Sequence, residues 1–585
     1  MPCSWLILVF AVLPSVASVA QAAIVEHTFR VSTPSLPRVC QPGNVTVTAV
    51  NGRVPGPEIE AREGDTLVVH VINDSPYNVT VHWHGVFQRG TPWADGPAMV
   101  TQCPIRLGHR YTYRFAVAGQ EGTLWWHAHS SFMRSTVHGA LVIRPRRGAG
   151  AGAGRYPFRT PDEEKTVLLG EWWNGDTVVL ENQAFSTGKT MRNADAYTIN
   201  GMPGDLYGCP EMTNNRIAKF EVSRDKTYLL RIINAALNTA FFFKVAGHTF
   251  TVVAADASYT EPYETDVIVI APGQTVDALM AADASPGCYY MAISSYQSAN
   301  PSLPFNGNTS TAVVEYLDAA PAPTSYPSSS PLFPTLPEPN DTFTAHQFYT
   351  SLTALVRLSR LAVPLAVDTR MFVTIGLGFS ICQLTQTQCM SNQTVVVATM
   401  NNVSFTLPTT VSMLEAQYRD TPDGVYTRDF PDQPPVVFDY TSTSLPRALS
   451  STGSPSTTKV KTLRYNATVE MVLQNTALIG RESHPMHLHG FNFFVLAQGF
   501  GNYDGGDAAG EEKFNLVNPQ ERNTIAVPTG GWAVIRFVAD NPGMWAMHCH
   551  IDAHLRIGLG MVFEVESGPT PETALPPPPP HFPQC

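Results

Sequence analysis

Histidine placement constrains this chain more than any other feature, because ten of its 17 histidines fall in four short clusters. On a β-strand, residues i and i+2 face the same side of the sheet, so each His-x-His pair can present two imidazoles to one side. Ten imidazoles would be a costly way to fill an apolar core. The sequence therefore predicts β-strands that hold metal ions. The clusters are His82-Trp-His84, His127-Ala-His129, His484-Pro-Met-His487-Leu-His489, and His548-Cys549-His550 with His554.

The rest of the chain is also typical of β-structure. It has 48 prolines and 42 glycines between segments rich in Val, Thr and Tyr, a composition that indicates short strands joined by turns. A Gly-Ala-rich stretch at 147–156 and a Pro- and Ser-rich stretch at 319–341 predict linkers. We therefore expect an all-β chain of three β-sandwiches, of which the outer two supply the histidines. The predicted domains are 24–146, 160–318 and 342–568, followed by a Pro-rich tail, 569–585.

The N-terminal segment 1–23 predicts secretion, because an apolar stretch followed by small residues is typical of a signal peptide. The chain has 37 basic and 48 acidic residues, a net charge of −11, which disfavours binding to nucleic acid or anionic lipid. Eight sequons in a secreted chain favour N-glycosylation. We expect a secreted glycoprotein with neither a membrane nor a nucleic-acid partner. The sequons begin at Asn44, Asn73, Asn78, Asn308, Asn340, Asn392, Asn402 and Asn466.

The nine cysteines also fit an oxidising compartment. Cys3 would leave with the signal peptide, and Cys549 lies among the histidines. Cys382 and Cys389 are close enough in sequence for a local disulfide. The number of cysteines left is odd, so at least one thiol, such as that of Cys288, stays unpaired.

The ligand count favours copper over zinc. One tetrahedral zinc site would leave most of the histidines unused. Cys549 with His484 and His554 makes the His₂Cys set of a blue-copper electron-transfer site. Eight clustered histidines then remain, four from each of the two outer predicted domains, which is enough for three further coppers. Because the flanking residues of Cys549 are themselves histidines, electrons collected one at a time could pass to a cluster that delivers four to O₂.

These motifs resemble those of the multicopper oxidases, and most closely the plant laccases. The resemblance extends across nearly the whole mature chain, and it implies three cupredoxin-like Greek-key β-sandwich domains and four copper ions. The four copper motifs are highly specific, whereas the tryptophan-rich segments mainly favour laccases within the superfamily. The matching segments are His82–Gly85, Trp93–Pro97, Gly122–His129, Gly170–Trp173, Asp195–Gly201, His484–Gly490 and His548–His554.

The resemblance also implies a ligand for each copper. His484, Cys549 and His554 would hold a type 1 copper, and His82 with His487 a type 2 copper. A binuclear type 3 pair would lie beside the type 2 ion, between the first and third domains. Its ligands would be His84, His127, His129, His489, His548 and His550. By similarity to ascorbate oxidase, two disulfides would join Cys103 to Cys585 and Cys40 to Cys209.

Leu559 stands at the axial position of the type 1 copper, ten residues after Cys549, where ascorbate oxidases have methionine. Without a thioether donor the reduction potential should rise, which suits phenols. We expect the nearby Met544 and Met561 to fill the core. The seven histidines outside the motifs are expected to be structural or at the surface.

Asp95 and Asp552 lie in motifs where related oxidases place acids near the copper cluster. We hypothesise that both relay the protons that O₂ reduction consumes. For Asp95, a turn residue in Ala-Asp-Gly-Pro is an equally weighted interpretation.

The predicted function is that of a monomeric, apoplastic laccase that oxidises phenols such as monolignols and reduces O₂ to water. Ascorbate oxidase stays open as an alternative, because the segment 88–96 is closer to that enzyme. A metallo-oxidase acting on Fe(II) or Cu(I) would need acidic or Met-rich residues beside its type 1 histidines, where the sequence offers only Glu482 and Asp552. A copper-free relative would have lost ligands, and all eleven are present here.

Overall fold

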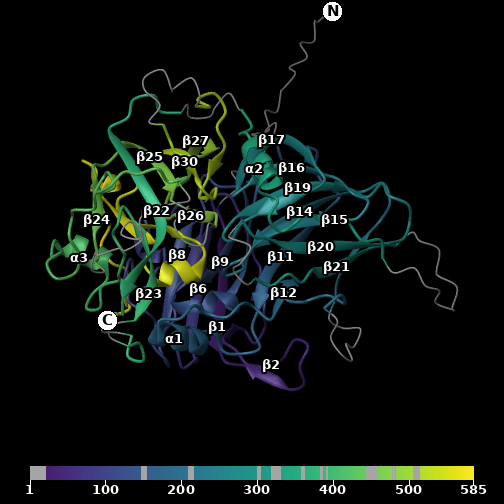
Figure 1. The fold of residues 1–585 in the computed structure, drawn as a ribbon, viewed down its shortest axis with the longest axis horizontal. Coiled ribbons are helices and arrows are strands. Elements are labelled where there is room, and N and C mark those ends of the chain that lie inside the picture. The colour runs from purple at the N-terminus through teal and green to yellow at the C-terminus, as the bar shows by residue number, and fades with distance from the viewer. Residues whose placement is uncertain are drawn as a thin grey trace, which may run out of the picture.

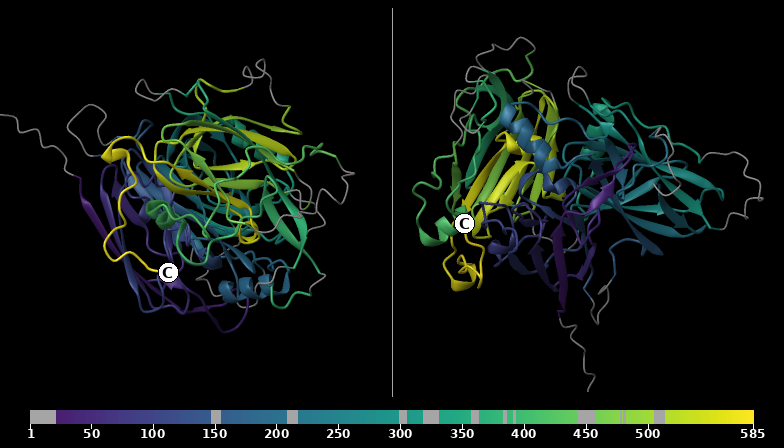
Figure 2. Two further views of the ribbon diagram at one scale, coloured as in Figure 1. Left: turned by 90° about the vertical axis from the view of Figure 1, so that its left-hand side faces the viewer. Right: turned by 90° about the horizontal axis from the view of Figure 1, so that it is seen from below.

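In a computed structural model of the chain, most of the regular secondary structure is β-strand (Figure 1). Strands of the second predicted block (teal) lie on one side of the molecule and those of the third (green to yellow) on the other, with the first block (purple) in contact with both (Figure 2). Within the described residues, no helix has the length and apolar character needed to cross a bilayer. The structure describes residues 22–146, 155–207, 217–298, 305–317, 331–356, 363–382, 386–390, 393–442, 457–476, 479, 482–504 and 514–585.

The first sandwich has two four-stranded sheets. Strand β8 shows how the sequence encodes it, because Tyr111, Tyr113 and Phe115 alternate with exposed residues and so face the core together. One sheet has the order β4-β1-β6-β8, from β1 (Ile24–Ser32), β4 (Ala49–Val50), β6 (Thr66–Asn73) and β8 (Arg110–Ala116). The other has the order β5-β10-β9-β7, from β5 (Ile59–Arg62), β7 (Val81–His84), β9 (Gly122–Ala128) and β10 (His138–Arg144). A separate ribbon pairs β2 (Ser35–Pro37) with β3 (Asn44–Thr46).

The second sandwich has sheets of six and five strands. Its strand β14 is buried along its whole length, as the apolar run at its centre predicts. The six-stranded order is β12-β11-β14-β19-β16-β17, from β11 (Glu163–Trp172), β12 (Ala196–Ile199), β14 (Thr227–Asn234), β16 (Phe250–Ala255), β17 (Ser258–Thr265) and β19 (Thr275–Ala281). The five-stranded order is β13-β21-β20-β15-β18, from β13 (Ala218–Val222), β15 (Ala240–Val245), β18 (Ile268–Ile270), β20 (Cys288–Tyr296) and β21 (Ser310–Tyr316).

The third sandwich also has sheets of six and five strands. The first has the order β23-β22-β25-β30-β27-β28, from β22 (Thr369–Ile381), β23 (Thr394–Met400), β25 (Thr468–Asn475), β27 (Phe493–Phe500), β28 (Glu521–Arg522) and β30 (Gly531–Val538). The second has the order β24-β32-β31-β26-β29, from β24 (Val460–Leu463), β26 (His484–Leu488), β29 (Thr524–Val527), β31 (Gly543–Cys549) and β32 (Gly560–Val565). The prediction of an all-β chain of three sandwiches is confirmed.

All three sandwiches share one strand topology. In each, the edge of one sheet begins with a parallel pair followed by antiparallel strands: β5-β10-β9-β7, β13-β21-β20-β15 and β24-β32-β31-β26. The histidine pairs lie on the last two strands of this series in the first and third sandwiches. The same two strands of the second sandwich, β15 and β20, carry Phe, Tyr, Met and Ile instead. The middle sandwich therefore has the fold that positions the histidines but none of the histidines.

Short helices and the C-terminal tail connect the sandwiches. Helix α1 begins after Asp176, whose carboxylate caps it, and packs on the 3₁₀ helix η2 beside the last histidine of the first block. The tail returns to the first sandwich, where the Trp93 indole nitrogen donates to the Pro576 carbonyl over 2.8 Å. The helices are η1 (Pro92–Ala94), η2 (Ser131–Ser135), α1 (Thr177–Thr187), α2 (Thr342–Ser351), α3 (Met413–Arg419), α4 (Asp552–Arg556) and η5 (Pro571–Thr573).

Two predicted disulfides are confirmed, Cys103–Cys585 and Cys382–Cys389, and Cys288 is an exposed free thiol as expected. Cys40 is disulfide-bonded, and its predicted partner Cys209 lies outside the described residues, as do the signal segment to residue 21, residues 147–154 of the first predicted linker and most of the second.

The sequons divide by exposure. Five asparagines are exposed and Asn402 is half-buried, whereas Asn392 lies outside the described residues. Asn73 is fully buried, and its amide donates to the carbonyls of Tyr77 and Ile105 over 2.7 and 2.8 Å. The folded chain therefore hides this sequon from modification. The exposed ones are Asn44, Asn78, Asn308, Asn340 and Asn466.

Candidate metal centre

Pairing of neighbouring strands brings the histidine clusters together two by two. Strands β7 and β9 are antiparallel, with His82 opposite His127. Strands β26 and β31 repeat this arrangement in the third sandwich, with His487 opposite His548. Because alternate residues of a strand share a face, the second histidine of each pair lies on the same side as the first.

The two sandwiches then meet face to face at these strands. The Nε2 atom of His548 lies 3.2 Å from that of His129 and 3.1 Å from that of His489, and His550 Nε2 lies 3.2 Å from Nδ1 of His84. The rings of His84 and His487 stack with their centroids 3.8 Å apart. All eight predicted cluster histidines are therefore brought together, from segments more than 400 residues apart in sequence for the pair His129–His548. Seven are buried and His129 is partly buried.

The ring nitrogens at this cluster are arranged as metal binding requires. The Nδ1 atoms of His82, His127 and His548 donate to backbone carbonyls over 2.8 to 3.0 Å. Nε2 on the opposite side of the His82 and His127 rings is buried, as is Nε2 of His487, and these three nitrogens make no hydrogen bond within the described residues. A buried polar atom without a partner is costly, so this set fits an ion held between the rings.

Electrostatics favours the same conclusion. Burial first, and neighbouring positive charge second, lowers the pKa of six cluster histidines well below its ordinary value. Neutral imidazole is the form that binds metal. These histidines are His84, His127, His129, His487, His489 and His550.

A second group lies entirely within the third sandwich. The Cys549 sulfur is 3.7 Å from Nδ1 of His484 and 3.6 Å from Nδ1 of His554, and all three residues are buried. Strand β26 supplies His484, strand β31 supplies Cys549, and helix α4 supplies His554. One sulfur and two imidazole nitrogens that converge on a single point are the donor set of a blue-copper site.

Two neighbours complete this group. Glu482 Oε1 lies 3.1 Å from Nε2 of His554, on the side of the ring away from Cys549, and this contact lowers the pKa of Glu482 against the opposing effect of burial. Leu559 is fully buried in the same apolar cluster as Cys549, and its carbonyl accepts the Cys549 amide over 3.1 Å. Met561 belongs to that cluster and Met544 to the first sandwich's core, as expected.

Asp95 lies directly against the histidine cluster. Its carboxylate accepts from Nδ1 of His489 over 2.9 Å and lies 3.3 Å from Nδ1 of His82, and it is fully buried. The turn that positions Asp95 requires glycine at position 96. Gly96 has a φ of 102°, and a Cβ at this position would lie 1.9 Å from the Val81 carbonyl oxygen. Asp95 is therefore both the turn residue and a contact of two predicted copper ligands.

Asp552 has a different environment. It forms an ion pair with Arg134, 3.0 Å from Nε to Oδ2, and burial raises the pKa of Asp552 while Arg134 opposes the shift. Arg134 also donates to the carbonyls of Ala236, Leu237 and His550, so one buried side chain joins all three sandwiches. Nothing in the local sequence marks Arg134, because the hydrogen-bond partners of its side chain are more than 100 residues away.

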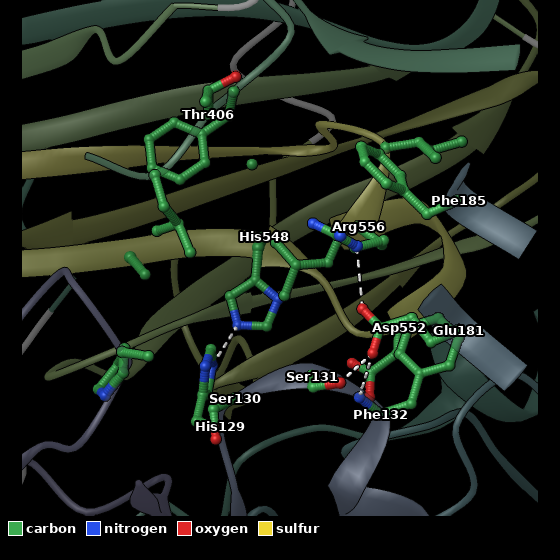
Figure 3. A pocket seen from close by; sticks show the side chains of 18 of the residues that line it. His129, Ser130, Ser131, Phe132, Glu181, Phe185, Thr406, His548, Asp552 and Arg556 are labelled. Atoms are coloured by element: carbon green, nitrogen blue, oxygen red, sulfur yellow. Dashed lines mark hydrogen bonds and ion pairs between the residues drawn. The ribbon is translucent and has the colours of Figure 1, made fainter. Parts of the chain in front are cut away.

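A cavity of about 490 Å³ reaches the histidine cluster rather than the Cys549 group (Figure 3). His127, His129 and His548 line it together with Asp552, and Figure 3 shows Glu181 of α1 on the same wall as Asp552. Glu181 accepts from the Phe132 amide and forms an ion pair of 2.9 Å with Arg556. No motif in the sequence marks Glu181, which becomes part of this wall only when α1 packs on η2.

The other seven histidines stay outside both groups, as expected. His138 and His248 are buried and bond to the carbonyls of Arg134 and Ala246, and the remaining five are at least partly exposed.

Comparison with known proteins gives one family throughout. Family models described as multicopper oxidase match residues 35–148, 163–318 and 429–569. Laccase-6 of Oryza sativa subsp. japonica is 79% identical and covers 100% of both chains. Laccase-7 of Arabidopsis thaliana is 54% identical and covers 98% of both.

Solved structures share the fold. The laccase from Botrytis aclada superposes with a TM-score of 0.68 at 24% identity, covering 96% of this chain and 90% of that one. Fet3p, a multicopper oxidase that functions in iron import, has a TM-score of 0.68 at 24% identity and covers 93% and 90% of the two chains.

Proposed function

The chain belongs to the multicopper oxidase family and is a laccase, and from that premise we propose that it is a secreted enzyme that oxidises phenols such as monolignols and reduces O₂ to water. The observation that carries the proposal is the convergence of eight histidines from two sandwiches beside a His₂Cys group. Lignin or other phenolic polymerisation is the role that we propose for the radicals it releases.

We assign the copper ligands as the resemblance implies. His484, Cys549 and His554 hold the type 1 copper, and His82 with His487 the type 2 copper. The grouping of His129, His489 and His548, whose ligand atoms lie within 4.8 Å of one another, supports their assignment to one ion of the type 3 pair. The contact of His84 with His550 supports the other. His127 completes the set of six, and the total is four copper ions.

Copper supplies one-electron acceptance at the Cys549 site and multi-electron O₂ reduction at the cluster. The chain supplies the connection between them. Cys549 is bonded through the backbone to His548 and His550, which belong to the cluster, so a covalent path of a few atoms joins the two groups. Leu559 provides only an alkyl side chain beside Cys549, and the absence of a thioether at that position supports phenols over ascorbate as donors.

Asp95 and Asp552 are the acids that we propose for the proton supply. Asp95 holds His489 through Nδ1, so it can pass a proton next to the cluster. Asp552 lines the cavity, which gives O₂, water and protons a way to His129 and His548. The Asp552–Arg134 pair holds the acid at the cavity wall.

A metallo-oxidase is less well supported. Asp552, one of the two acids near the type 1 ligands in sequence, is paired with Arg134. Of these two acids, Glu482 is then the one that contacts the outer nitrogen of His554. Fe(II) typically binds a carboxylate together with histidines, and the histidines beside Glu482 are the ones that we assign to the type 1 copper, so Glu482 alone is a poor Fe(II) site.

The proposal includes the mature enzyme's form. The segment 1–23 would be removed on secretion to the apoplast, and the three domains 24–146, 160–318 and 342–568 would remain in a glycosylated monomer. The five exposed sequons are the sites that we expect to carry glycans.

The test is O₂ uptake by the copper-loaded, secreted protein with coniferyl alcohol, ascorbate or Fe(II) in parallel. We expect fast uptake with the phenol, weak response to ascorbate and no accumulation of peroxide. Faster uptake with ascorbate or Fe(II) would overturn the substrate class and keep the copper sites. No uptake with any donor, from a protein with four bound coppers, would overturn the oxidase function itself.

A further inference from the structure

The residues Asn523 and Thr524 lie between two predicted copper ligands that come from different sandwiches. The Asn523 side-chain oxygen and the Thr524 hydroxyl each lie 3.1 Å from Nε2 of His84, in the first sandwich. The Asn523 carbonyl accepts from Nδ1 of His487, in the third sandwich, over 2.9 Å, and the Thr524 hydroxyl lies 3.1 Å from the same nitrogen. All four residues are buried.

These contacts decide which nitrogen each ring directs at the cluster. Five histidines, His487 among them, bond outward through Nδ1 and so direct Nε2 inward. His84 is reversed, because its Nε2 bonds to Asn523 and Thr524 and its Nδ1 points to Nε2 of His550, 3.2 Å away. A neutral imidazole binds metal through one nitrogen and carries its proton on the other, so the acceptor on the outer nitrogen fixes the tautomer.

Close packing holds Asn523 in this position. Gly85, which directly follows His84, has a φ of 83°, and a Cβ there would lie 2.5 Å from the Asn523 amide nitrogen. The glycine of the His-Trp-His-Gly motif therefore makes room for a side chain of the third sandwich.

The second sandwich fixes the same segment from the other side. Arg522, one residue earlier, forms a buried ion pair of 2.9 Å with Asp256. Gln274 donates from its side chain to the Thr524 carbonyl over 3.1 Å. The copper-free sandwich thus anchors the backbone on which the two cluster contacts depend.

We propose that Asn523 and Thr524 are positioning residues that set the tautomers of His84 and His487 and so fix the relative placement of the two half-sites of the copper cluster. The inference rests on the proposed laccase function, since it concerns the cluster where O₂ is reduced. Loss of the acceptor on the outer nitrogen of a metal-bound histidine generally lowers metal affinity or activity by about 10- to 100-fold, and we expect a loss of copper affinity of about that size here.

The experiment compares Asn523→Leu, Asn523→Asp and a matched control, Asn541→Leu, in the copper-loaded protein. Asn541 is also buried and crosses the same boundary, donating to the carbonyls of Phe87 and Gly490, but within the described residues it makes no hydrogen bond to a histidine ring. Copper retained after dialysis against graded chelator is measured by elemental analysis, and the blue thiolate absorption is recorded in the same samples.

We expect Asn523→Leu to release cluster copper at about 10- to 100-fold lower chelator concentration, with the blue absorption of the Cys549 site unchanged. Asn523→Asp, which keeps an acceptor oxygen, should restore most of the retention, and Asn541→Leu should match the wild type. Thr524→Val against Thr524→Ser repeats the comparison with a smaller change in shape, should Asn523→Leu fail to fold.

Equal copper retention in Asn523→Leu, Thr524→Val and the wild type would overturn the inference and leave the proposed function in place. Equal losses in Asn523→Leu and Asn541→Leu would also overturn it, because general loosening of the boundary would then be the cause. A wild-type protein that is colourless and binds no cluster copper would instead contradict the proposed function.

Discussion

The two predicted copper groups differ in how much of the molecule each one needs. The His484–Cys549–His554 group is built from two neighbouring strands and the short helix α4 of one sandwich, within 71 consecutive residues. The eight-histidine cluster needs two sandwiches in contact, and contacts such as His84–His550 join residues 466 positions apart. The first group depends on local folding, whereas the second depends on how domains dock. Damage to the boundary should therefore affect the cluster first, and damage within β31 should affect both.

The largest effect should come from Cys549→Ser. Removing the sulfur eliminates the only thiolate of the His₂Cys group and the covalent start of the path to the cluster, so phenol-dependent O₂ uptake should fall to background. The blue absorption should disappear, while elemental analysis should still find the cluster's coppers. Loss of all copper from this variant would show that the two groups do not form independently.

Arg134→Met should lower stability most among boundary changes. It leaves the carboxylate of Asp552, whose side chain is only 13% exposed, without its partner and removes donors to three carbonyls from two other sandwiches, so the free energy of unfolding should fall by about 3–5 kcal/mol. Denaturant unfolding of the copper-loaded protein measures this. Arg144→Met is a matched control. Arg144 also forms two ion pairs, with Glu60 and Glu164, but its side chain is more exposed, so this substitution should change the free energy of unfolding by less than about 1 kcal/mol.

Asp95→Asn should separate the two groups by function. The amide can hold its place in the turn but cannot pass a proton, so reoxidation of the reduced enzyme by O₂ should slow by about 100-fold. The blue absorption and the rate of reduction by phenol should stay at wild-type values, because Asp95 contacts no residue of the Cys549 group in the described structure. If stopped-flow measurements find reoxidation at the wild-type rate, Asp95 has no part in proton transfer and serves only as a turn residue.

The smallest effect concerns His138, a buried histidine next to the cluster that belongs to neither group. Burial lowers the pKa of His138 to about 4, against 6.5 in an unfolded chain, so the unfolded state takes up the proton first as pH falls. Stability attributable to His138 is therefore present above pH 6.5 and is lost as pH falls from 6.5 toward 4. The wild type should lose about 1 kcal/mol more than His138→Asn between pH 7 and pH 5.5.

The variant keeps a donor for the Arg134 carbonyl, which His138 Nδ1 contacts over 2.6 Å. Parallel pH dependence of unfolding in the two proteins would show that the ring is not held neutral by burial.

Short-range features of the site were predictable because they follow from strand geometry and spacing. The same-side pairing of His82 with His84, the local disulfide Cys382–Cys389 and the free thiol of Cys288 need only neighbouring residues or counting. The Cys103–Cys585 disulfide was predicted from a family resemblance, since its loop of 482 residues gives no local signal. The burial of Asn73 was not predicted, because a sequon records three residues and not the fold around them.

Long-range contacts could not be read from any motif. No motif marks Arg134 or Asn523. Asn523 contacts His84, which is 439 residues away, and Arg134 donates to carbonyls of the two other domains. The middle sandwich was predicted as a third β-sandwich without clustered histidines, and its strands β15 and β20 carry mainly Phe, Tyr, Met and Ile.

The sequence by itself determined which side chains can bind metal: eleven nitrogen and sulfur donors, most of them at spacings that place them along strands, with Cys549 between two cluster histidines. Those spacings are local, and a strand's period of two residues is enough to interpret them. Only the tertiary structure decided which nitrogen of His84 faces the cluster, which acids contact it and where the cavity opens. These depend on docking between domains, where the geometry is set by surfaces whose residues are hundreds of positions apart.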